Sequence, residues 1–209
     1  MIIAIDGPAA AGKGTLARKL ASHFGLNYLD TGSLYRAVGV AVLRAGKDPS
    51  DPAAAEAAAR NLDPDGLSDP ALRGEEAGDA ASKVGAIPAV RAALLEFQRA
   101  YAARPPGAVL DGRDIGTVVC PEAAVKLFVT ASIEKRAERR LKELLDKGVS
   151  VIGERILQEM KDRDARDSAR SVAPLVSAVD AVLLDTSELD VDAAFAAAVK
   201  IISQRRPAD

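Results

Sequence analysis

The chain has 209 residues, and 28 lysines and arginines against 30 aspartates and glutamates give it a net charge of −2. This length predicts one compact domain with a substantial core, and the balanced charge excludes a global positive field that would attract nucleic acid. One cysteine, Cys120, and no apolar run of 18 residues exclude a disulfide scaffold and a membrane span, so we expect a cytoplasmic protein without nucleic-acid or membrane partners.

The first expected element is a short buried strand over residues 1–5, ending at Asp6. A glycine-rich turn and a helix over residues 13–24 follow, which is the order in which G-x-x-x-x-G-K forms a phosphate-binding P-loop. Glycines let backbone N–H groups approach phosphate oxygens, the helix N-terminus adds further N–H groups, and Lys13 supplies a movable positive charge. Thr15 offers a hydroxyl to the phosphates or to Mg²⁺. The residues predicted to bind nucleotide phosphates are Gly7, Pro8, Ala9, Ala10, Ala11, Gly12, Lys13, Gly14 and Thr15.

Gly14 separates the lysine of this loop from the hydroxyl residue, whereas the general pattern places Ser or Thr directly after the lysine. A Lys-Gly-Thr ending resembles the nucleoside monophosphate kinases rather than the GTPases. A GTPase would also need an Asn-Lys-x-Asp base reader, and neither Asn27 nor Asn61 begins one. A nucleotide-gated switch is therefore the less favoured interpretation of this loop.

Further along the chain, short apolar runs alternate with amphipathic segments. Additional strands are expected over residues 27–29, 108–110, 124–130 and 181–184. Helices are expected over residues 33–43, 53–61, 80–87, 89–103, 154–167 and 191–204. A further helix is expected after the strand over residues 124–130 and ends at residue 145. Residues 62–78 are expected to form an irregular Pro- and Gly-rich connection. This alternation predicts an α/β fold with about five parallel strands and helices on both faces. Ligand-binding groups would then gather at the carboxyl ends of the strands.

Two side chains that could take part in binding or catalysis follow the strand over residues 108–110. Asp111 ends this strand, as a Walker-B carboxylate does when it helps to hold hydrated Mg²⁺; a turn-capping aspartate is the alternative. Arg113 lies two residues later, where its planar guanidinium suits bidentate contact with a phosphate. Beside a P-loop, both residues are candidates for phosphate chemistry.

A second cluster of charged residues lies on one face of a later expected helix. Arg163, Arg166, Asp167 and Arg170 share this face by helical geometry. Their spacing leaves two interpretations open. The cluster is either a solvent-exposed face held by ion pairs or a set of arginines that recognises oxyanions, because every base in it is an arginine.

Four motifs occur in order along the chain. They are Asp6-Gly7-Pro8 with Gly12-Lys13-Gly14-Thr15, then Asp30-Thr31-Gly32 with Tyr35-Arg36, then the segment from Asp111-Gly-Arg113-Asp114 to Val119, and finally Arg163-Asp-x-x-Asp167-x-x-Arg170 with Pro174-Leu175. Together they resemble the bacterial cytidylate kinases. The first motif is shared by many kinases, whereas the last two are much more particular. The resemblance covers residues 1 to about 187.

The resemblance implies ATP as phosphoryl donor, Mg²⁺, and CMP, with dCMP, as the acceptor. The residues it assigns to catalysis are Lys13, Asp111, Arg113 and Arg163, with Thr15 and Asp111 near the metal, directly or through water. It places Tyr35, Arg36 and Arg113 at the acceptor's phosphate, Ser82, Arg91, Asp114 and Arg170 around the cytosine, and Arg163 and Asp167 at the ribose. Thr31 keeps the hydroxyl that the family has at its position.

The resemblance also implies a domain organisation. One kinase domain would cover residues 1–209, with a monophosphate-binding region over 36–103 and a lid over 147–172, and we expect a monomer. The short connection over 62–78 departs from the longer, strand-rich insert of many family members. Other acceptors, such as UMP, AMP or shikimate, stay open as alternatives, because residue spacing alone does not name the base.

Overall fold

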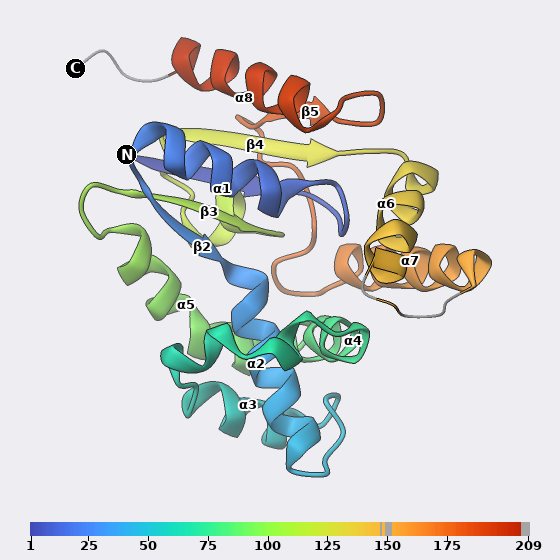
Figure 1. Ribbon diagram of the computed structural model, residues 1–209. Coiled ribbons are helices and arrows are strands. Elements are labelled where there is room, and N and C mark those ends of the chain that lie inside the picture. The colour runs from blue at the N-terminus through green and yellow to red at the C-terminus, as the bar shows by residue number, and fades with distance from the viewer. Residues whose placement is uncertain (147, 149–151, 206–209) are drawn as a thin grey trace.

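The computed structural model describes residues 1–146, 148 and 152–205, and of residue 65 the backbone alone. Its strands form one parallel sheet in the order β2-β3-β1-β4-β5 (Figure 1). These strands are β1 (Ile2–Asp6), β2 (Asn27–Asp30), β3 (Ala108–Gly112), β4 (Val125–Thr130) and β5 (Val182–Asp185). The predicted α/β fold with five parallel strands is confirmed.

The helices follow the strands in the alternation that the sequence predicts. They are α1 (Lys13–Phe24), α2 (Thr31–Arg44), α3 (Pro52–Arg60), α4 (Glu75–Val84), α5 (Pro88–Ala102), α6 (Ile133–Asp146), α7 (Gly153–Ser168) and α8 (Val191–Arg205), with two 3₁₀ turns, η1 (Pro64–Ser68) and η2 (Pro70–Arg73), and a π-helical turn, η3 (Ile115–Val119). Among the described residues, none of these helices combines the length and apolar character that a membrane crossing requires.

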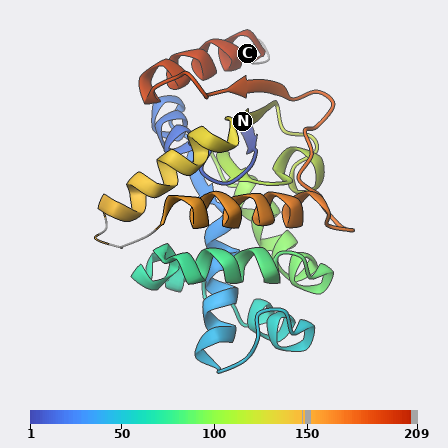
Figure 2. The same ribbon diagram turned by 90° about the vertical axis from the view of Figure 1, so that its right-hand side faces the viewer.

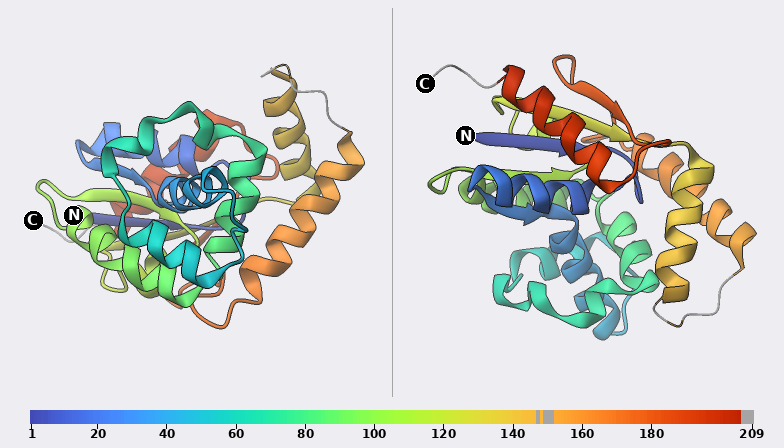
Figure 3. Two further views of the ribbon diagram at one scale, coloured as in Figure 1. Left: turned by 90° about the horizontal axis from the view of Figure 1, so that it is seen from below. Right: turned by 45° about the horizontal axis from the view of Figure 1, so that its top comes forward.

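Helices cover both faces of the sheet. Successive side chains of a strand point to opposite sides, so the apolar residues of each strand must be buried on both faces. Ile3 and Ile5 of β1 pack with Leu20 of α1 and Ile202 of α8, and Figure 3 shows both helices on this side. Ala4 belongs instead to a cluster on the other face, which contains residues of α5 and η3. The prediction of a doubly covered sheet is therefore confirmed.

The helical region α2–α5 extends beyond one end of the sheet and has an apolar core of its own (Figure 1). Within residues 62–78 the structure differs from the expected irregular connection. Two 3₁₀ turns occupy part of it, and α4 begins at Glu75 rather than near residue 80. Two glutamates stand in the first turn of α4, where the positive end of the helix dipole stabilises negative charge.

Helices α6 and α7 pack against each other, and α7 also lies alongside α4, as Figure 2 shows. Leu144, Ile156 and Met160 form the buried apolar cluster between α6 and α7. The predicted lid over residues 147–172 includes α7 but begins partly outside the described residues, at 147 and 149–151. The strand ends, the α2–α5 region and α7 thus surround a common space.

Candidate active site

The loop from β1 to α1 has the backbone conformation that its glycines permit. Gly12 caps α1 with φ of 87°, and Gly7 has φ of 144°. A Cβ added to Gly7 would stand 1.9 Å from the backbone oxygen of Val129 in β4, so only glycine fits where the loop crosses this strand. The Lys13 Nζ donates to the carbonyl of Pro8 at 2.7 Å. The loop therefore wraps around its own lysine.

A cleft of about 1750 Å³ opens between this loop, the α2–α5 region and the α6–α7 pair. Of the predicted phosphate-binding residues, it is lined by Ala9, Ala10, Gly12, Lys13, Gly14 and Thr15, and Gly7, Pro8 and Ala11 lie outside the lining. All the other predicted site residues line it: Thr31, Tyr35, Arg36, Ser82, Arg91, Asp111, Arg113, Asp114, Arg163, Asp167 and Arg170. Residues from widely separated parts of the sequence thus meet in one place.

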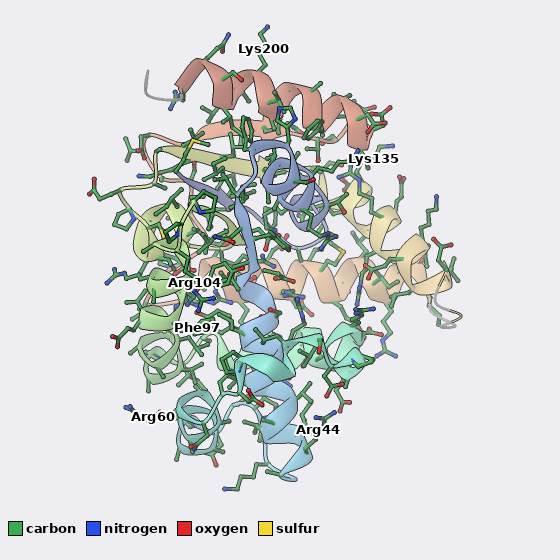
Figure 4. All side chains as sticks on the ribbon, turned by 60° about the vertical axis from the view of Figure 1, so that its left-hand side comes forward. Arg44, Arg60, Phe97, Arg104, Lys135 and Lys200 are labelled. Atoms are coloured by element: carbon green, nitrogen blue, oxygen red, sulfur yellow. The ribbon has the colours of Figure 1, made fainter. Side chains whose placement is uncertain are left out.

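Several basic side chains have no part in this cleft. Figure 4 shows Arg60 and Lys200 projecting outward from the ribbon, and neither residue belongs to the cleft lining. The predicted arginines, in contrast, come from α2, α5, α7 and the segments just after β3 and α7, and all reach the same space as Lys13. Cationic side chains from separate elements therefore meet in the cleft, where as many acidic as basic residues form the lining.

Burial and neighbouring charges change the acidity of the basic groups in the cleft. Burial and the neighbouring charge of Arg113 lower the pKa of Lys13 to about 7. Burial and the same guanidinium lower the pKa of Arg163 to about 10. Crowded cations favour an anionic ligand, because a phosphate group would relieve their mutual repulsion. The electrostatics of the cleft thus fit a site for polyanions.

Asp167 of α7 is the carboxylate around which this wall is organised. Its Oδ2 accepts from the Arg113 Nε at 3.0 Å, its Oδ1 accepts from the Ser82 Oγ at 3.1 Å, and Arg170 pairs with it. Burial opposes its ionisation, yet Arg113, Arg170 and Arg163 together hold the pKa of Asp167 below its ordinary value. The Asp167 side chain is only 2% exposed. The predicted ion pairs exist, but the solvent-face interpretation is wrong, because the cluster lines the cleft.

Arg91 and Asp114 form a second ion pair inside the cleft. Their side chains are 8% and 6% exposed, and Arg91 also donates to the carbonyl of Gly85 at 3.1 Å. The guanidinium lies 5.3 Å from the centre of the Tyr35 ring, which is a cation–π distance. A donor from α5, an acceptor from the segment after β3 and an aromatic ring from α2 therefore lie together.

Asp111 is a buried carboxylate beside the phosphate-binding loop. A Cβ added to Gly14 would lie 3.2 Å from its Oδ2. Burial and the nearby charge of Asp30 raise the pKa of Asp111 to about 7. Within the described part of the chain, no lysine or arginine pairs with this carboxylate; its side chain is met by the Tyr28 hydroxyl at 3.5 Å. Such a carboxylate would be ionised more readily beside a divalent cation.

Two carboxylates escaped the sequence-based assignment. Asp30 caps α2 by accepting from the Ser33 amide at 3.2 Å and pairs with Arg36, so α2 begins at residue 31 rather than near 33. Asp6 accepts from the amides of Ile115 and Gly116, both at 2.7 Å. An aspartate at a strand end was the available signal for both, since each ends a strand at the sheet edge where the cleft opens.

The hydroxyl of Thr31 has a structural contact in addition to its place in the cleft. Its Oγ1 donates to the Asp111 carbonyl at 2.7 Å, and the side chain is buried. This bond joins the start of α2 to the end of β3. Thr31 thus helps to hold the two strand ends together at the mouth of the site.

A parallel sheet in this strand order, a phosphate-binding loop at its carboxyl edge and an arginine wall facing that loop define a P-loop phosphotransferase of the nucleoside monophosphate kinase class. The chain belongs to the cytidylate kinase family, whose sequence model, described as "Cytidylate kinase", matches residues 3–204. It is therefore an enzyme, a nucleoside monophosphate kinase.

Relatives agree with this assignment, and a solved structure agrees with the fold. The chain is 67% identical over 208 residues to a cytidylate kinase of Paramagnetospirillum magneticum, covering 98% of this chain and 99% of the relative. It is 61% identical over 209 residues to a cytidylate kinase of Rhodospirillum rubrum, with 98% of each covered. The crystal structure of an uncharacterized protein from Eubacterium ventriosum superposes with a TM-score of 0.58 at 18% identity, covering 98% of this chain and 99% of that chain, which supports the fold alone.

Proposed function

We propose that this enzyme transfers the γ-phosphoryl group of ATP to CMP, and also to dCMP, giving ADP and CDP or dCDP. The observation that carries the proposal is the meeting of Lys13 with five predicted arginines in one cleft; these arginines are Arg36, Arg91, Arg113, Arg163 and Arg170. Two nucleotides whose phosphates face each other carry several negative charges, and a nearly neutral protein can hold them only where its cations are gathered.

Positioning and charge neutralisation are the main requirements of phosphoryl transfer. In the proposed arrangement, the loop of residues 7–15 binds ATP and Lys13 follows the transferred group. Arg113 and Arg163 neutralise the charge that spreads over that group, and Tyr35 and Arg36 hold the acceptor's phosphate. The phosphate oxygen of CMP is already a competent nucleophile, so no side chain has to be activated for covalent catalysis.

The cytosine is proposed to bind at the group formed by Ser82, Arg91, Asp114 and Arg170. A carboxylate such as Asp114 accepts from the exocyclic amino group of cytosine, whereas uracil presents an oxygen at the same position. Arg91 donates, which suits the acceptor atoms of the base. Arg163 and Asp167 are proposed to meet the ribose.

Mg²⁺ is proposed to bind with ATP beside Asp111 and Thr15. Mg²⁺ prefers oxygen ligands and is usually held by one or two carboxylates together with substrate phosphates and water. The residues fit this requirement, because Asp111 is a buried carboxylate without a cationic partner among the described residues and Thr15 lies exposed in the cleft lining. The bound ion would neutralise phosphate charge during transfer.

Residues 36–103 are proposed to form the monophosphate-binding region and residues 147–172 the lid, whose closure would exclude water and protect ATP from hydrolysis. We further propose a monomer that acts on freely diffusing nucleotides in the cytoplasm, in line with its single cysteine. Sedimentation of the purified protein measures the oligomeric state.

ADP release with MgATP and a panel of acceptors tests the proposal. CMP and dCMP should support turnover at much higher kcat/KM than UMP, AMP, GMP or shikimate. Equal rates with UMP and CMP would remove the cytosine assignment while keeping the kinase. ATP turnover that no acceptor stimulates would instead favour a nucleotide-gated switch and contradict the proposed transfer.

A further inference from the structure

Arg136 of α6 is a buried cation that the proposed transfer does not use. Its side chain is 7% exposed, and it is not among the residues that line the cleft. Its three nitrogens donate to three oxygens: Nε to the Ala131 carbonyl at 3.0 Å, Nη1 to the Ala9 carbonyl at 3.3 Å, and Nη2 to the Asp164 Oδ2 at 2.7 Å. Arginines are almost never buried unless they are paired. The positions of these three acceptors therefore show which segments the buried Arg136 holds together.

The three acceptors belong to three segments of the site. Ala9 is in the phosphate-binding loop, directly before Ala10, which has φ of 58°. Ala131 follows β4, and Asp164 is on α7. Ala10 also packs against the apolar cluster between α6 and α7. Polar and apolar contacts thus join the loop to the α6–α7 pair, which Figure 2 shows as two neighbouring helices.

We propose that Arg136 is a positioning residue that fixes the loop carbonyl of Ala9 and, through Asp164, the rotation of α7 that brings Arg163 to the transferred phosphoryl group. The inference rests on the proposed function. A loop that binds phosphate must turn its backbone amides toward the phosphate. Because the carbonyl and the amide of one peptide unit lie in the same plane, a hydrogen bond that fixes the Ala9 carbonyl also fixes the direction of the adjoining amide. Arg136 supplies the donor that holds it.

Asp164 connects this arginine to catalysis because it neighbours Arg163 in sequence. Consecutive residues on a helix point about 100° apart, so Asp164 can pair with Arg136 while Arg163 faces the cleft. There the Arg163 Nε lies 4.0 Å from the Oδ2 of Asp167 on the same helix, which is its ion-pair partner. Within the described residues the Asp164 Oδ1 is buried without a partner, so Arg136 is the group that offsets its charge.

Steady-state ADP release with CMP and MgATP tests the inference on Asp164→Asn and Arg136→Lys, with thermal unfolding measured in parallel. Asp164→Asn should lower kcat by about 10- to 100-fold with little change in the KM for ATP, since small misplacements of catalytic groups have effects of this size. Arg136→Lys, which also weakens the Ala9 contact, should lower kcat and raise the KM for ATP. The matched control is Lys135→Gln on the same helix, whose partly exposed pair with Glu138 should leave both constants unchanged.

The decisive comparison places Asp164→Asn in an Arg163→Ala background. If Asp164 acts through Arg163, the second substitution should change kcat by no more than about 2-fold. Losses that multiply in the double variant, or a wild-type kcat in Asp164→Asn alone, would overturn the inference. If Asp164→Asn does not fold, Asp164→Glu keeps the charge on a longer arm and serves the same comparison.

Failure of the proposed function is distinguishable from failure of this inference. A wild-type enzyme without CMP-dependent ADP release would overturn the function first. ATP titration by calorimetry would then still test the loop contact, because Arg136→Lys should weaken ATP binding relative to Lys135→Gln. Equal ATP affinities in these two variants would count against the role assigned to Arg136.

Discussion

The Arg113 Nε donates to the Asp167 Oδ2 at 3.0 Å, which joins the segment after β3 to α7 across 54 residues of sequence. This bond places a residue that directly follows the central strand β3 and a residue of the predicted lid in one wall of the cleft. The same carboxylate also binds Ser82 of α4. Three regions that the sequence assigns to different tasks are therefore connected through a single buried aspartate.

Lys13→Ala should abolish most of the activity without unfolding the protein. The Nζ is the cation that the phosphate loop encloses, and removal of one preorganised charge from a transition state lowers kcat on the order of 10²–10³-fold or more. Its burial already disfavours the charged form, so the thermal midpoint should move by no more than about 5 °C. Lys19→Ala on the same helix, which breaks a pair with Asp192, should leave kcat unchanged. A fully active Lys13→Ala enzyme would contradict the proposed role.

Asp114→Ala should reduce the preference for CMP over UMP. A well-placed acceptor for the cytosine amino group contributes about 1–3 kcal/mol of discrimination, so the ratio of kcat/KM values should fall by about 5- to 150-fold. The variant should also lose about 3–5 kcal/mol of unfolding free energy, because Arg91 remains buried without its partner. Glu56→Ala, which breaks a pair with Arg60 away from the cleft, is the control for surface ion pairs. Unchanged selectivity in Asp114→Ala would remove its role in base recognition.

Asp111→Asn should stabilise the fold at neutral pH while it lowers activity. Burial and Asp30 raise the pKa of Asp111 from 3.8 to about 7 in the folded protein, so the folded state binds more protons than the unfolded chain between these values. Stability from this group is therefore present below pH 4 and is lost as the pH rises to about 7. Asparagine does not titrate, and the variant should gain on the order of 3 kcal/mol at pH 8 relative to wild type.

Chemical unfolding of Asp111→Asn and wild type at pH 4, 6 and 8 measures this difference. Asp192→Asn is a useful control, since Lys19 holds the pKa of Asp192 below its ordinary value and its removal should give no stabilisation at pH 8. A difference between Asp111→Asn and wild type that does not grow with pH would contradict the assigned pKa. In the same variant, the Mg²⁺ concentration for half-maximal activity should rise if Asp111 helps to hold the ion.

Gly7→Ala should destabilise the protein far more than a glycine replacement in open space. The new Cβ would overlap the Val129 oxygen, and the strand β4 that carries it cannot move without disturbing the sheet. Gly46→Ala is the matched control, since Gly46 has φ of 69° but nothing within 4 Å of the added atom. The control should cost about 1–2 kcal/mol for its left-handed backbone alone. Urea unfolding measures the free energy of unfolding of both variants. Equal losses would contradict the prediction, because they would show that the overlap with Val129 adds no cost.

Much of the fold could be read from local features of the sequence. Short apolar runs that alternate with helical periodicity predicted the strands, and the structure confirms all five of them and their parallel arrangement. The order of strand, glycine turn and Lys13 identified the phosphate loop, because each residue type there meets a local backbone requirement. The start of α4 at Glu75 was missed, since the Pro- and Gly-rich segment before it has no periodic apolar pattern.

Short-range patterns and motifs in a fixed order are enough to predict the phosphate-binding loop, the parallel sheet and the family. The position of the Arg163–Asp167–Arg170 cluster in the cleft is known from the fold alone, since its spacing fits a solvent face equally well. Only the tertiary structure brought Arg136 to Ala9, 127 residues away. The reason is physical: helical and strand periodicity specify which face of an element is polar, but the packing of other elements decides what that face meets.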